Sequence, residues 1–128
     1  MTRLGYVRVD RLGDDDSDQH EALRRAGVRR ANIFTDTASS TTTASSRPGW
    51  RLLLEELRPG DTVVVSRLST LGGDPTDVAL TLGALELMGA SVRAVHEGLD
   101  TGERPGPTLE ALAVMLAPSP PTLKPSAA

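Results

Sequence analysis

The amino-acid sequence predicts an α/β fold: a mostly parallel sheet of four to five strands with helices on both faces. Short strand-like segments alternate with helical segments along the 128 residues. The segment at 62–66 contains three consecutive valines, an apolar run that is typical of a parallel strand buried on both faces. Glycine and proline residues occur in the connections between these segments, as is typical of turns and loops. We place one domain at residues 1–117 and a disordered Pro-rich tail at residues 118–128.

The strands are predicted from runs of β-branched and aromatic residues. The first run, Leu-Gly-Tyr-Val-Arg-Val, covers residues 4–9. Further strands are expected at residues 31–35, 62–66 and 91–95. In open α/β sheets the functional site lies at the carboxyl ends of the strands. The loops at those ends begin at Asp10, Thr35, Ser66 and His96.

The helices are predicted from apolar spacing and from their end signals. We expect helices at residues 14–26, 50–57, 76–88 and 108–117, with Pro48 suited to the first turn of the second. The acidic run at 14–18 suits the positive end of the first helix, and Gly27 suits its carboxyl end. The last helix would carry Leu109, Leu112 and Leu116 on one face and end before Pro118. The Ser/Thr-rich segment at 37–46 is expected to be a mobile loop.

Composition narrows the classes of site and partner. The chain has no cysteine and two histidines, so we expect no disulfide, no metal site and no cofactor. No apolar run is long enough to span a membrane and no signal peptide is evident, so we expect a cytoplasmic protein. A net charge of −3 is unfavourable for DNA binding. Arginines cluster near the end of the first helix, where they form either a solvated helix face or a patch that faces DNA. They are Arg24, Arg25, Arg29 and Arg30.

Six segments resemble, in order and spacing, the catalytic domain of resolvase/invertase-type serine recombinases. They lie at residues 5–10, 19–23, 33–36, 47–49, 57–61 and 97–101. The first, Gly-Tyr-Val-Arg-Val-Asp, is similar to the family's G-Y-x-R-V-S, and the fourth and fifth are similar to R-P-G and L-R-P-G-D. The resemblance implies a resolvase-like three-layer fold and a function in DNA recombination. In this family a serine hydroxyl attacks a backbone phosphate while arginines stabilise the transition state.

The resemblance also assigns roles to individual positions. Asp10 stands at the position of the nucleophilic serine, and Arg8 and Arg47 stand at those of phosphate-binding arginines. Gln19 stands where an active-site polar residue belongs. Ser69 and Thr70 replace an acid and an arginine, and a second arginine position holds Gly73.

These departures predict an inactive domain. A carboxylate is a weak base, so Asp10 is a poor nucleophile against a sugar alkoxide leaving group. Attack by its carboxylate would form a mixed anhydride that hydrolyses instead of conserving the phosphodiester energy. We expect Asp10 to occupy the anion position and to pair with Arg8, Arg47 or both, because residues two apart share one strand face.

Three functions follow from this sequence. The first is a non-catalytic recombinase-like protein that associates with itself or with a full-length recombinase through helix faces. The second is an active DNA recombinase that uses another nucleophile, from the Ser39–Ser46 loop. The third is a scaffold reused to bind a small anion or metabolite at Gly72 and Gly73. DNA is a partner in the first two, with weak binding expected because the helix-turn-helix domain of simple resolvases is not evident.

Overall fold

A computed structural model describes residues 1–102 and shows one five-stranded sheet with the strand order β2-β1-β3-β4-β5. Four strands are parallel, and β5 runs antiparallel to β4. The strands are β1 (Arg3–Val9), β2 (Ile33–Thr37), β3 (Thr62–Val65), β4 (Ser91–Ala94) and β5 (Leu99–Asp100). The helices are α1 (Ser17–Arg25), α2 (Pro48–Glu56) and α3 (Pro75–Leu87). Three short 3-10 helices are η1 (Arg30–Asn32), η2 (Ala44–Ser46) and η3 (Leu68–Leu71).

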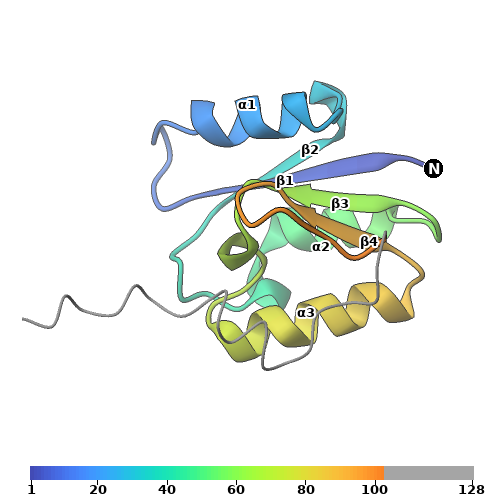
Figure 1. The fold of residues 1–128 in the computed structure, drawn as a ribbon. Coiled ribbons are helices and arrows are strands. Elements are labelled where there is room, and N and C mark those ends of the chain that lie inside the picture. Colours follow the sequence, from blue (N-terminus) through green and yellow to red (C-terminus); the bar gives the residue numbers. More distant parts are fainter. Residues whose placement is uncertain (103–128) are drawn as a thin grey trace, which may run out of the picture.

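The helices cover both faces of the sheet, as predicted. Helix α1 lies on one face, and α2 and α3 lie on the other (Figure 1). Strand β3 supplies both layers: Val64 packs with the α1 side, while Val63 and Val65 join the α2 and α3 side. All three valines are fully buried, which explains the apolar run in this central strand.

Some predicted boundaries were wrong. The strand expected at 31–35 begins at Ile33, because the preceding residues form η1, and it continues to Thr37. The first helix begins at Ser17, inside the acidic run at 14–18, and not at Asp14. Strand β5 was not predicted, because two residues are too few to show a periodic pattern. The helix predicted at 108–117 and the tail at 118–128 lie outside the described residues.

Among residues 1–102 no helix has the length and apolarity that crossing a membrane requires. The same residues bring together no group of three or more His, Asp or Glu side chains that could hold a metal ion.

Candidate functional site

A pocket of about 370 Å³ opens at the carboxyl ends of β1 and β3. It is lined by four of the six site residues predicted from the sequence: Arg8, Gln19, Ser69 and Thr70. The other lining residues are Ser40, Ser66, Arg67, Gly72, Gly73, Asp74, Pro75 and Val78. Asp10 and Arg47 do not line the pocket but are hydrogen-bonded to residues that do. Asp10 accepts from Arg8, and Arg47 donates to the carbonyl oxygen of Thr70. The predicted residues therefore gather at the predicted end of the sheet.

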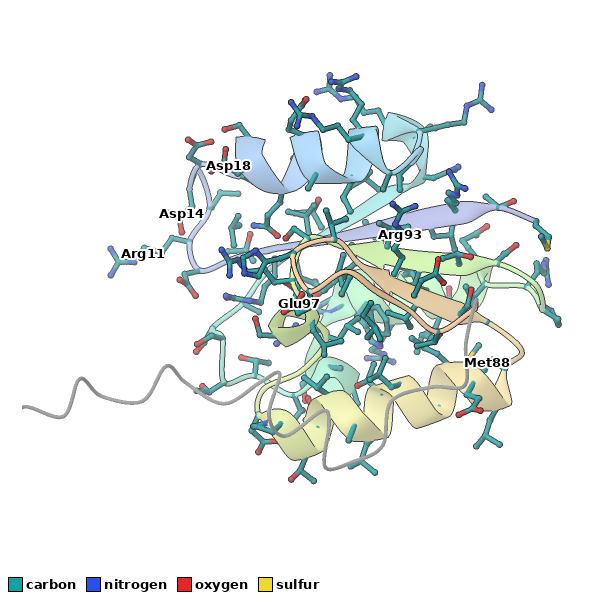
Figure 2. All side chains as sticks on the ribbon, in the orientation of Figure 1. Arg11, Asp14, Asp18, Met88, Arg93 and Glu97 are labelled. Carbon is teal, nitrogen blue, oxygen red and sulfur yellow. The ribbon has the colours of Figure 1, made fainter. Side chains whose placement is uncertain are left out.

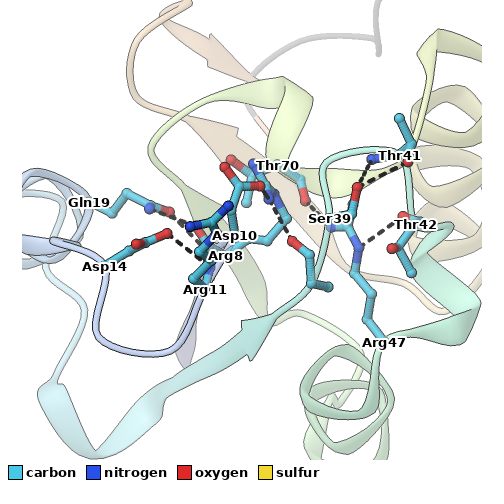
Figure 3. A network of polar contacts seen from close by, with 11 residues as sticks. Arg8, Asp10, Arg11, Asp14, Gln19, Ser39, Thr41, Thr42, Arg47 and Thr70 are labelled. Carbon is cyan, nitrogen blue, oxygen red and sulfur yellow. Dashed lines mark hydrogen bonds and ion pairs between the residues drawn. The ribbon is translucent and has the colours of Figure 1, made fainter.

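Asp10 and Arg8 form an ion pair. Nη1 of Arg8 lies 2.7 Å from Oδ1 of Asp10 and also donates to the carbonyl oxygen of Ala38 at 2.7 Å (Figure 3). The Arg8 side chain is 18% exposed and that of Asp10 is 65% exposed. The predicted pairing of Asp10 with an arginine is confirmed for Arg8. It follows from the two-residue spacing, which directs both side chains to one side at the end of β1.

Arg8 should control the titration of Asp10. The hydrogen bond and the positive charge of Arg8 lower the pKa of Asp10. The pair therefore stabilises the fold above the ordinary carboxyl pKa, and this stabilisation is lost as the pH falls through the depressed value. In Arg8→Ala, we expect the NMR titration midpoint of Asp10 to rise toward that of a free aspartate.

Asp15 provides the internal control for this titration. The pKa of Asp15 is also lowered, but by hydrogen bonds from Ser17. Its midpoint should not change in Arg8→Ala. An unchanged Asp10 midpoint, or an equal rise at both carboxyls, would show that Arg8 does not hold Asp10.

Arg47 is wholly buried and is held by main-chain carbonyls. Its Nη1 donates to Thr70 at 2.7 Å and its Nε donates to Thr42 at 3.0 Å (Figure 3). Its Nη2 has no hydrogen-bond partner among the described residues. No ion pair between Arg47 and Asp10 occurs in the described part of the chain. Arg47 precedes α2 and joins the Ser/Thr-rich loop to η3, which directs its guanidinium into the interior.

Gln19 completes the hydrogen bonding of a strand end. Its Nε2 donates to the carbonyl of Arg8 at 2.8 Å, and its Oε1 accepts from the Arg8 amide at 3.2 Å. Strand β3 pairs with β1 only as far as Tyr6. The side chain from α1 thus replaces the missing strand partner beyond that point, and both ends of its amide are engaged.

The η3 turn forms one wall of the pocket. Ser69 is exposed there, whereas Thr70 is buried and its carbonyl accepts from Arg47. The exposed Arg67 also lines the pocket and was missed by the sequence reasoning. Its position one residue after the loop start at Ser66 could have identified it.

Asp36 is a second residue that the site reasoning missed. Its buried carboxylate accepts from the Tyr6 hydroxyl at 2.7 Å. It also accepts from the backbone amides of Gly49 at 2.6 Å and Trp50 at 2.8 Å. Burial, together with the Asp36 carboxylate, raises the pKa of Tyr6, so the phenol stays protonated and donates. Asp36 thus caps the first turn of α2 from the end of β2.

Glycines 72 and 73 are required by close packing. A Cβ atom at Gly72 would lie 2.7 Å from the amide nitrogen of Val78, and one at Gly73 would overlap the main chain of Thr41. The Gly73 amide donates to the Asp77 carboxylate at 2.8 Å, and that carboxylate also accepts from Ala44 at 2.9 Å. The Ser/Thr-rich loop, expected to be mobile, is therefore anchored to the start of α3.

Comparison with known proteins identifies the family. Residues 3–118 match the family described as "Resolvase, N terminal domain". The chain belongs to the resolvase family of serine recombinases. It is 35% identical over 101 residues to the Transposon Tn3 resolvase of Escherichia coli, covering 79% of this chain and 54% of that protein. It is 35% identical over 103 residues to the Serine recombinase gin of Escherichia phage Mu, covering 80% and 51%.

The fold agrees with this assignment. The N-terminal catalytic domain of TP901-1 integrase superimposes with a TM-score of 0.67 at 20% identity, covering 88% of this chain and 92% of that domain. This similarity confirms the resolvase-like α/β fold predicted from the sequence. The chain spans about half the length of the curated relatives that it matches.

Proposed function

We propose that this resolvase-family domain does not cleave DNA and that Asp10 takes the place of a DNA phosphate beside Arg8. The observation that carries this proposal is the 2.7 Å contact between Nη1 of Arg8 and the Asp10 carboxylate. A fixed negative charge at this position repels an incoming phosphate and occupies the cation that would bind it. The family resemblance supports the assignment, because it aligns Asp10 with the nucleophile and Arg8 with a phosphate ligand.

The second arginine supports the same proposal. Arg47 is buried and directs two of its three nitrogens at carbonyl oxygens. To reach a phosphate at the pocket mouth it would have to leave the carbonyls of Thr42 and Thr70. One lost transition-state donor lowers a rate by about 100- to 1,000-fold. Positions 70 and 73, which hold arginines in the family, hold Thr70 and Gly73 here.

A domain without cleavage can still act in recombination through association. We propose assembly with a second copy or with a full-length recombinase, and weak contact with DNA, in the cytoplasm. This proposal rests on membership of a family whose named relatives are resolvases and recombinases.

The test is a search for covalent protein–DNA species. The purified chain is incubated with supercoiled plasmid, quenched with detergent and examined for nicked DNA and DNA-bound protein. We expect neither product, and we expect Asp10→Ser to remain inactive because the arginines at 70 and 73 are still missing. An active resolvase with its own recombination site is the positive control.

Two results would contradict this proposal. A covalent adduct formed by the unaltered chain would show that cleavage survives. Peptide mapping of that adduct would then distinguish Asp10 from a nucleophile in the Ser39–Ser46 loop. Full cleavage by Asp10→Ser alone would show that the remaining site is intact.

A further inference from the structure

Helix α1 forms the outermost layer on its side of the sheet, and it carries opposite charges at its two ends (Figure 1). Asp14, Asp15 and Asp18 are exposed at its amino end, where Figure 2 labels two of them, and are termed the acidic end. Arg29 and Arg30 are exposed just beyond its carboxyl end and are termed the basic end. The outer surface around α1 is therefore negative at one end and positive at the other.

Stabilisation of the helix itself explains only part of this charge. A negative charge in the first turn and a positive charge in the last turn interact favourably with the helix dipole, and the effect fades beyond these turns. Asp18 lies in the first turn, and Arg24 and Arg25 lie in the last. The other residues of the acidic end and both residues of the basic end lie outside the helix. Their charges are thus available to a partner molecule.

The charges of the two ends are not neutralised within the described molecule. The two arginines of the last turn both bind Glu21, at 2.6 and 3.0 Å. In contrast, neither the acidic end nor the basic end forms an ion pair within residues 1–102. The nine residues of α1 span about 14 Å. Because the Debye length is about 8 Å at physiological ionic strength, the two ends are largely screened from each other.

A groove of about 460 Å³ extends along α1 and adds a hollowed, partly apolar surface to these charges. Its lining reaches from Asp16, next to the acidic end, to Arg30 of the basic end. Val28 and Ile33 supply apolar surface between them. The full lining consists of Asp16, Ser17, His20, Glu21, Arg24, Val28, Arg30 and Ile33. A partner that matches this surface needs a positive group, an apolar part and a negative group in that order.

We propose that a second copy of the chain binds this face, with the two α1 helices antiparallel and related by a two-fold axis. In a two-fold interface the same patch serves both molecules, so that each contact occurs twice. The antiparallel arrangement brings the basic end of each copy to the acidic end of the other, with Arg30 beside Asp18. A parallel arrangement would instead set like charges against each other. This inference rests on the association proposed above and gives it a surface.

A second copy fits this face better than DNA does. Phosphates would be attracted to the basic end, but the acidic end of the same helix would repel the rest of the duplex. A second copy carries the two charges in reverse order, so that neither end meets a like charge. Ion pairs at a surface are individually weak and are screened by salt. We therefore expect a reversible dimer that dissociates as the salt concentration rises.

Charge reversal at the two ends tests this arrangement. Sedimentation of the full chain is measured at low and high salt over a range of protein concentrations. We expect an equilibrium between monomer and dimer, with the dimer as the largest species and a dissociation constant that rises several-fold at high salt. Arg30→Glu and Asp18→Arg should each weaken the dimer several-fold, because each substitution places like charges together at both contacts.

A mixture of the two variants is the decisive measurement. In a mixed dimer both contacts again join opposite charges, so an equimolar mixture of Arg30→Glu and Asp18→Arg should dimerise about as tightly as the unaltered chain. Arg51→Glu is the matched control, because Arg51 is exposed on α2, on the other face of the sheet. This control should dimerise like the unaltered chain. Fluorescence of the buried Trp50 verifies that every variant is folded.

Each contrary outcome overturns the inference in a distinguishable way. Unchanged dimerisation in both variants would show that another surface joins the copies, and no recovery in the mixture would show that Arg30 and Asp18 do not meet. Species larger than a dimer would exclude the two-fold arrangement. A chain that stays monomeric under all conditions would refute self-association as such. None of these results alters the proposal that cleavage is lost, which the search for covalent protein–DNA species tests separately.

Discussion

Replacement of Asp36 by alanine is expected to lower the free energy of unfolding by about 3–5 kcal/mol, since hydrogen bonds to a charged group each contribute about 1.5–3 kcal/mol. The Asp36 carboxylate is buried and accepts from the Tyr6 hydroxyl and from two amides of the first turn of α2. Alanine would leave all three donors without a partner and would leave a cavity. Urea unfolding followed by Trp50 fluorescence measures the loss.

Two variants separate the components of this effect. Tyr6→Phe removes only the hydroxyl bond and should cost about 1–2 kcal/mol. Asp36→Asn keeps the shape but turns an acceptor into a donor, so its cost should lie between those of the other two variants. If Asp36→Ala unfolds at the same urea concentration as the unaltered protein, the three bonds do not stabilise the fold. Because Asp36 fixes the start of α2, we also expect it to position the preceding Arg47.

The sequence predicted the fold well because the fold depends on local periodicity. The alternation of strand and helix patterns identified every long element of residues 1–102, and Val63, Val64 and Val65 identified the central strand. The contact between Arg8 and Asp10 was predictable for the same reason, since it follows from their spacing along one strand.

Contacts between distant segments could not be predicted in this way. The carbonyl partners of Arg47 lie on a loop and on a 3-10 turn, and no periodicity relates them to position 47. The capping role of Asp36 depends on the approach of α2 to the end of β2. The two glycines of the η3–α3 connection suggested a ligand loop, whereas in the structure they allow the Ser/Thr-rich loop and α3 to pack closely.

Substitution of Gly73 is expected to open the Ser/Thr-rich loop. A side chain at this position would overlap the main chain of Thr41, which cannot be relieved by a change of rotamer. Overpacking of this kind costs about 1–3 kcal/mol, so we expect Gly73→Ala to lose stability in this range. The loop should also become sensitive to a broad-specificity protease. Ser69→Ala, at an exposed neighbouring position, should stay within about 0.5 kcal/mol of the unaltered protein.

The larger substitution Gly73→Arg tests whether the packing of the Ser/Thr-rich loop against position 73 excludes an arginine from this part of the site. It restores the residue type that the family holds at this position, but the loop must first move away. That movement would break the bond from Ala44 to Asp77 and the bond from Arg47 to Thr42. We expect stronger protease cleavage than in Gly73→Ala and no gain of DNA cleavage. If both variants keep the stability and protease pattern of the unaltered chain, the loop is not held against position 73. If the loop opens as expected, its closed conformation depends on glycine at position 73. An arginine then cannot be restored at this position while the loop stays closed.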